Sequence, residues 1–417
     1  MSGDRHFQAG DHVIACTAGL TVPTLSGQGR KMPADEPVSD PTPPPAASER
    51  LLSLDVYRGM VMLLLASSGF GIAKYASNLE GPFAEWLLFQ GTHPEWNSQF
   101  GIFGLALWDL IQPAFMFIVG VSMPFSYEKR ERLGQSYRSR MRHAWTRALL
   151  LTLLGVFLQS LRQDETNWIF TNVLSQIGLG YGLLFFLVGK PPRTQFLTGG
   201  AILIGYYLLM LVFPRGLDDW RMHFENGTTF PQQFDTWFLN LFPREKPFET
   251  HAYSTLNFVP SLVTMLMGLM SGQVLKNPST SSGTKLKQLW IAAGILLLTG
   301  TVLGLTICPV VKKLWTPSWT LYSGGWVIGL LALSYWIIDV KKWNGRVFPF
   351  VVVGLNPLTM YLLGMMSRGW FLENFRRHLP DFLFAGPTRP IVEATLLVVV
   401  FWLILWWMYR RKIFLRL

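Results

Sequence analysis

The residues with the clearest chemical potential are His93 and Asp109, which lie at the start of a long apolar stretch. From about residue 100 to 125 the chain is almost entirely Leu, Ile, Phe, Ala, Val, Met and Gly, long enough to cross roughly 30 Å of hydrocarbon. A carboxylate there costs about 2.5 to 3.5 kcal/mol, so Asp109 should face the protein interior or a wet cavity. An imidazole that titrates near neutrality suits His93 to general-base catalysis. Asp109 is therefore a functional candidate; the alternative is a structural hydrogen bond between helices.

Pro113 follows Asp109 by four residues in the same apolar stretch. A proline inside a helix lacks the N–H group and its ring clashes with the carbonyl four residues earlier, which is here the carbonyl of Asp109. We therefore expect the helix to bend at this point. A bent helix that carries a polar group is suited to line a cavity.

Polar residues interrupt apolar sequence at two further places. Asp55 and Arg58 are three residues apart where a helix is expected to begin, so the carboxylate can cap the first turn and the guanidinium can reach it or a phosphate. Asn356 and Tyr361 lie in a later apolar run. They are expected either to contact a ligand or to join helices by hydrogen bonds.

The composition is that of a membrane protein. Half of the 417 residues are hydrophobic and 15% are charged, against about 25% charged in an ordinary soluble domain. The net charge of +11 is explained by basic cytoplasmic loops rather than by a nucleic-acid partner. Cys16 and Cys308 form neither a ligand cluster nor a disulfide framework, and no metal is expected.

The pattern predicts an all-α, polytopic fold with ten membrane-spanning helices within residues 50–417. Apolar runs of about 17 to 25 residues give these approximate limits: 57–76, 101–126, 144–161, 169–188, 195–213, 256–275, 288–308, 318–338, 347–367 and 391–409. Residues 1–49 contain a proline-rich run and no apolar stretch long enough for a signal peptide. We expect them to form a disordered cytoplasmic tail.

The basic residues predict the orientation in a cell membrane. They are concentrated in alternate segments between the predicted spans, above all from Lys129 to Arg147, and such segments face the cytoplasm. Both termini are then cytoplasmic. His93 lies on the external, periplasmic or lumenal side.

Five short motifs, taken in order, resemble the catalytic region of the heparan-α-glucosaminide N-acetyltransferase family. They comprise Ser53, Asp55, Arg58 and Gly59; His93, Trp96 and Asn97; Asp109 to Gly120; Leu314, Trp315, Ser318 and Trp319; and Gly354, Asn356 and Tyr361. Together they extend over about residues 50 to 370, which is nearly the whole predicted membrane domain.

The resemblance implies a transmembrane acyltransferase that takes an acetyl group from cytosolic acetyl-CoA and delivers it to an amino sugar or other glycan on the external face. It places the family's catalytic histidine on His93, with Asp109 in the same polar cavity. The residues expected to bind the substrates are Asp55, Arg58, Trp96, Asn97, Trp315, Asn356 and Tyr361. The partners are thus the lipid bilayer, acyl-CoA and a glycan acceptor, and a homodimer is left open.

The sequence departs from the family pattern at three places. The spacing from His93 to Asp109 is longer, Gln176 stands where the pattern has an arginine, and His251 and Ala252 occupy an expected acidic, glycine-bearing turn. These places are close to where an acceptor is expected to bind. They leave the identity of the acceptor open.

A transporter or flippase of a sugar or lipid-linked substrate is the competing hypothesis. In it, Asp109 and the bent helix would form a gated polar path across the membrane. Inverted repeats would favour transport, and we find no sequence symmetry between the two halves of the chain.

The predicted topology can be tested with reporter fusions at Lys285 and Asn226. The charge distribution places Lys285 in a cytoplasmic segment and Asn226 in a long external one. The two fusions should therefore report opposite sides of the membrane. Reporters on the same side would contradict the topology.

Overall fold

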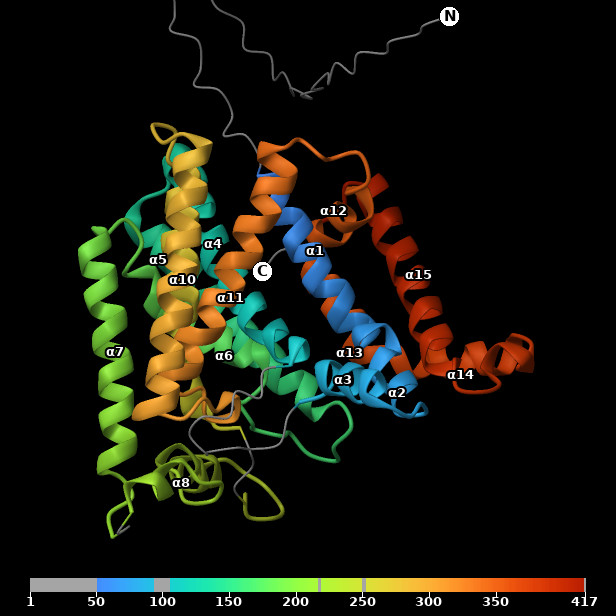
Figure 1. The fold of residues 1–417 in the computed structure, drawn as a ribbon, viewed down its shortest axis with the longest axis horizontal. Helices are drawn as coiled ribbons and strands as arrows, with labels where there is room; N and C mark the ends of the chain where they lie inside the picture. Colours follow the sequence, from blue (N-terminus) through green and yellow to red (C-terminus); the bar gives the residue numbers. More distant parts are fainter. Residues whose placement is uncertain (1–50, 94–105, 217–218, 250–252, 416–417) are drawn as a thin grey trace, which may run out of the picture. The chain divides into compact units, whose positions relative to one another are not determined.

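The computed structural model describes residues 51–93, 106–216, 219–249 and 253–415, and every regular element within these ranges is a helix. This confirms the predicted all-α class. Six helices are long and apolar enough to cross a membrane (Figure 1). With their short 3₁₀ or π extensions they are η2 (Leu107–Leu110) with α4 (Ile111–Arg132), α7 (Pro192–Val212), η5 (Thr255–Asn257) with α9 (Phe258–Lys276), α10 (Ser282–Thr306), α11 (Pro317–Tyr335) with η7 (Trp336–Val340), and α15 (Arg389–Arg410).

Two further spans are bent helix pairs. The first joins α1 (Leu52–Ser67) through η1 (Gly69–Gly71) to α2 (Ile72–Ala76) with a bend of 54°, and the second joins α12 (Phe348–Leu355) to α13 (Pro357–Met366) with a bend of 80°. Counting each pair as one span gives up to eight. The remaining helices are α3 (Pro82–Gly91), α5 (Tyr137–Ser160), α6 (Val173–Phe185), η3 (Trp220–Phe224), α8 (Phe230–Phe238), η4 (Leu239–Leu241), η6 (Lys312–Leu314), α14 (Arg368–His378) and η8 (Asp381–Phe384).

The prediction of ten spans is too high by these criteria. Predicted spans 144–161 and 169–188 fall on α5 and α6, which do not meet them. The first half of α5 carries several arginines, whose transfer into hydrocarbon is costly. α6 has 13 residues, so it is about 20 Å long. The other eight predicted spans each coincide with a qualifying helix or bent pair.

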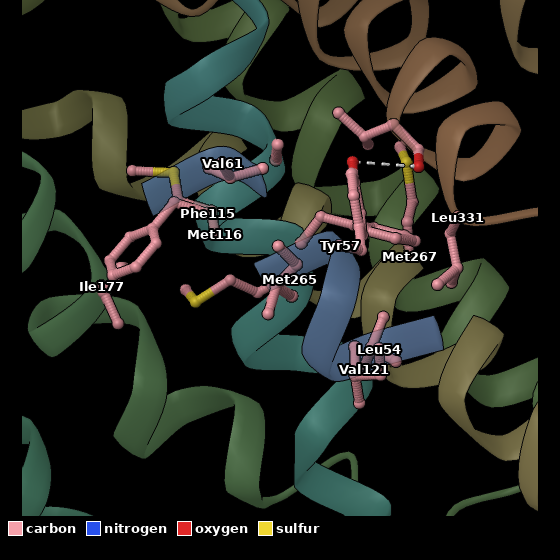
Figure 2. Packing of buried hydrophobic residues seen from close by; sticks show 14 of the residues in the cluster. Leu54, Tyr57, Val61, Phe115, Met116, Val121, Ile177, Met265, Met267 and Leu331 are labelled. Carbon is pink, nitrogen blue, oxygen red and sulfur yellow. Dashed lines mark hydrogen bonds between the residues drawn. The ribbon is translucent and has the colours of Figure 1, made fainter. Parts of the chain in front are cut away.

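The closest helix contacts depend on glycine. A Cβ atom on Gly120 of α4 would overlap the carbonyl oxygen of Met265 in α9, and a Cβ on Gly268 or Gly272 of α9 would overlap carbonyl oxygens of α4. Small residues spaced four apart let two membrane helices approach closely. Figure 2 shows the core beside this contact, in which Phe115 and Met116 of α4 lie near Met265 of α9.

A second close contact joins α1 to α12. A Cβ on Gly59 would overlap the carbonyl oxygen of Phe350, and a Cβ on Gly354 would overlap that of Asp55. The start of α1 therefore lies directly against the end of α12. α1 is also tied to α11, because the Tyr57 hydroxyl donates to the carbonyl oxygen of Val327 at 3.3 Å (Figure 2).

The glycine contacts predict a clear difference between two Gly→Ala substitutions. Gly268→Ala should destabilise the protein by about 1–3 kcal/mol, because the methyl group has no room beside α4. Gly200→Ala, in α7, is the matched control, since nothing lies within 4 Å of the added Cβ. Thermal unfolding in one detergent should give a lower Tm for Gly268→Ala than for Gly200→Ala. Equal values would show that α4 and α9 can separate at little cost.

Candidate active site

His93, Asp109 and Lys312 form one compact polar cluster. Asp109 Oδ1 lies 2.7 Å from His93 Nδ1 and 2.8 Å from Lys312 Nζ. Lys312 Nζ is 3.0 Å from His93 Nδ1. The side chains of Asp109 and Lys312 are 3% and 10% exposed, whereas that of His93 is 45% exposed. The buried Asp109 and Lys312 side chains thus both contact the accessible imidazole of His93.

Three separate segments bring this cluster together. His93 follows α3, whose Gln90 side chain accepts a hydrogen bond from the Leu107 N–H at 3.0 Å and so fixes the end of α3 against η2. Asp109 lies in η2, directly before α4, where the helix dipole favours a negative charge. Lys312 lies in η6, between α10 and α11.

Pro113 does not bend α4 in the expected way. It falls in the first turn of the helix, because α4 begins at Ile111. The first N–H groups of a helix have no intrahelical partner, so a proline there removes no hydrogen bond. Asp109 occupies the 3₁₀ turn that precedes the helix.

The charges of the cluster determine which atoms can act. A carboxylate only accepts and an ammonium only donates hydrogen bonds. Asp109 therefore accepts from Lys312, while His93 Nδ1 either donates to Asp109 or accepts from Lys312, depending on the tautomer. In the tautomer with Nδ1 protonated, the Nε2 lone pair is free to take a proton. Burial lowers the pKa of Lys312, while the Asp109 carboxylate opposes that shift. Burial and then the charge of Asp109 raise the pKa of Tyr253 to about 12, so this nearby phenol stays protonated.

Asp55 and Arg58 lie at a second place, on a cavity of about 640 Å³. Arg58 contacts Asp55 Oδ1 at 3.2 Å, donates to the Gly354 carbonyl oxygen at 3.3 Å and donates to Ser122 Oγ at 2.6 Å. The cavity extends along α4 from Phe115 to Arg130 and reaches Leu133, just beyond the end of the helix. Its basic lining residues are Arg58, Lys129, Arg130, His143 and Arg147, and its apolar ones include Phe115, Ile118, Leu151, Ile177, Leu358 and Phe414.

Three other predicted residues belong neither to the cluster of His93, Asp109 and Lys312 nor to the lining of the cavity. Trp315, three residues after Lys312, is fully buried, and its Nε1 is 3.4 Å from Thr264 Oγ1. Tyr361 stacks on Phe115 with ring centroids 6.3 Å apart, behind the cavity wall. Asn356 is fully buried and its side chain contacts the backbone of residues 413 and 415.

The remaining predicted positions are Trp96 and Asn97, together with His251 and Ala252, and they lie outside the described residues. Gln176, which replaces the expected arginine, is buried and donates from Nε2 to the carbonyl oxygens of Phe170, Ser254 and Thr255 at 2.9 to 3.3 Å. Its amide therefore fixes the segment before α9.

Lys312 and Tyr253 are the members of this region that the sequence did not predict. Lys312 lies two residues before Leu314 of the Leu314 and Trp315 motif, and this proximity was the available signal. Among the residues that the structure describes, no three His, Cys, Asp or Glu side chains are grouped so that they could hold a metal ion.

Comparison with known proteins agrees with the motifs. The family described as heparan-alpha-glucosaminide N-acetyltransferase, catalytic, matches residues 50–307. The human heparan-alpha-glucosaminide N-acetyltransferase is 23% identical over 433 residues, which cover 88% of this chain and 60% of the human protein. The mouse protein of the same name is 22% identical over 88% of this chain and 61% of its own length. The chain thus spans about three fifths of the length of these relatives.

The buried pair predicts strong coupling between Asp109 and Lys312. Asp109→Asn should cost about 3–5 kcal/mol, because it leaves the Lys312 ammonium buried without its opposite charge. Adding Lys312→Met should restore part of this loss, since no uncompensated charge then remains. Thermal unfolding of the two single variants and the double variant measures the coupling. Lys313→Met is the control, and simple additivity of the Asp109 and Lys312 effects would contradict the pairing.

Proposed function

The chain belongs to the heparan-alpha-glucosaminide N-acetyltransferase catalytic family, and from this we propose that it transfers an acetyl group from acetyl-CoA to an amino sugar or other glycan acceptor across the membrane. The family comprises membrane acetyltransferases that use acetyl-CoA. The observation that carries the proposal is the position of two sites along α4. The imidazole and carboxylate pair lies at its start, and a basic cavity lies along the rest of the helix.

The cavity has the chemistry that acetyl-CoA requires. The nucleotide end of the donor carries phosphates, which Arg58, Arg130 and Arg147 can bind with charge-assisted hydrogen bonds. The thioester arm is less polar and matches the apolar side chains around Phe115 and Ile118. A basic rim also favours a cytoplasmic opening, which gives access to cytosolic donor.

The reacting end would then point towards His93. Phe115, which lines the cavity, follows Asp109 by six residues, or roughly 9 Å of helix. An acceptor amine or hydroxyl that approaches from the external face must lose a proton as it attacks the thioester carbonyl. His93 Nε2 takes this proton, the C–S bond breaks, and the CoA thiolate that leaves accepts the proton from the imidazolium.

Asp109 and Lys312 act on the imidazole rather than on the substrate. Asp109 fixes the ring orientation and the tautomer with Nδ1 protonated, which leaves Nε2 as the base. Lys312 neutralises Asp109 and so reduces the cost of keeping a carboxylate buried. This division of roles is that of a base oriented by a buried carboxylate.

The proposed function predicts that His93→Ala loses transfer but keeps donor binding. Removing a general base typically lowers the rate by about 10² to 10⁴. The purified protein in detergent should release free CoA from acetyl-CoA when glucosamine is added, and His93→Ala should do so more slowly by about that factor, with unchanged acetyl-CoA affinity. His378→Ala, at the exposed end of α14, is the matched control and should keep full activity.

Two outcomes would count against this function. Near-wild-type transfer by His93→Ala would remove the histidine from the mechanism. Failure of the wild-type protein to consume acetyl-CoA, together with uptake of a labelled sugar into proteoliposomes, would instead favour the transporter hypothesis.

A further inference from the structure

We propose that residues 413–415 form a strap that walls one side of the donor cavity, and that Asn356 is the positioning residue that holds it there. The inference rests on the proposed function, because it assigns the cavity to acetyl-CoA. It gives the buried Asn356 side chain a role through the strap rather than through direct contact with substrate.

The end of α15 directs the chain back towards the cavity. Lys412 adopts a left-handed conformation, with φ of 57°. Its N–H donates to the Tyr409 carbonyl oxygen at 3.0 Å, and the Ile413 N–H donates to that of Met408 at 2.8 Å. This pair of bonds is the Schellman arrangement that ends a helix and reverses the chain. The strap therefore begins at a defined turn.

Asn356 binds the strap with both ends of its amide. Its Nδ2 donates to the Ile413 carbonyl oxygen at 3.0 Å, and its Oδ1 accepts from the Leu415 N–H at 2.9 Å. The Asn356 side chain thus offers the strap one donor and one acceptor, as the peptide groups of a neighbouring strand would. A buried amide that uses donor and acceptor on one segment fixes both the position and the direction of that segment.

Asn356 lies at a break between two helices, where its side chain can reach the strap. It occupies the break between α12 and α13, where the chain bends by 80°. Beside it, the Gly354 carbonyl oxygen accepts from Arg58 Nη1 at 3.3 Å. The same break thus orients the Arg58 guanidinium and anchors the strap.

The strap contributes directly to the cavity surface. Phe414 and Leu415 line it together with Pro357 and Leu358, which follow Asn356 in α13. These apolar groups complete the wall around the basic residues. Release of the strap should therefore weaken donor binding and leave the chemistry at His93 largely unchanged, because His93 belongs to a separate cluster.

The test separates acetyl-CoA KM from kcat in the purified protein and its variants. Asn356→Ala removes both hydrogen bonds and should raise KM for acetyl-CoA by roughly tenfold, with kcat within about twofold of wild type. A chain that ends at Lys412 should give a similar rise. The combined variant should show no further rise, because Asn356 has then no strap to hold.

Two additional variants keep the test independent of folding. Phe414→Ala should raise KM while Phe414→Leu, which preserves an apolar wall, should leave it near the wild-type value. Asn374→Ala is the matched control, since this asparagine donates within its own helix, to the Trp370 carbonyl oxygen at 2.8 Å, and KM should not change.

The outcomes distinguish the strap from the proposed function. If wild-type protein turns over acetyl-CoA and Asn356→Ala has an unchanged KM, the strap proposal is wrong and the function stands. Additive rises in KM for Asn356→Ala and the shortened chain would also overturn it, because the two changes would then act separately. If the wild-type protein neither binds nor consumes acetyl-CoA, the proposed function fails and the strap fails with it.

Discussion

The candidate active site depends on one buried carboxylate, the lysine that neutralises it and the histidine beside it. Asp109 is 3% exposed at the start of a membrane-spanning helix, where an unpaired charge is costly. Lys312 supplies the opposite charge, and His93 supplies the second donor to the same oxygen. Because this pairing fixes the Asp109 side chain, it also fixes which imidazole nitrogen faces the open side.

Contacts between glycines and neighbouring backbones set the position of α4, the helix that Asp109 precedes. α4 can lie close enough to α9 only because Gly120, Gly268 and Gly272 have no side chains. The reciprocal contacts of Gly59 and Gly354 do the same for α1 and α12. Arg58 then reaches both Ser122 of α4 and the α12–α13 break. The small residues therefore determine the position of the cavity's charged groups as much as the charged residues themselves do.

The sequence predicted the helical class and most spans, and it singled out Asp109 with His93 as functional candidates, because a carboxylate in an apolar run is conspicuous. It could not predict Lys312 as their partner, since 203 residues separate it from Asp109 and local pattern carries no information on that contact. Asn356 was conspicuous for the same reason as Asp109. Its partners are backbone groups of residues 413 and 415, which any sequence could provide, so its contact was not predictable.

The length of α4 is compatible with the proposed transfer between opposite faces of the membrane. Its 22 residues extend about 33 Å, close to the roughly 30 Å thickness of the hydrocarbon core. The cavity-lining residues of α4 run from Phe115 to Arg130, or about 23 Å of that length. Under the proposed function, a donor that enters at the basic end would extend along most of this helix within one cavity. The stretch between Phe115 and the Asp109 turn would then separate the acyl group from the imidazole.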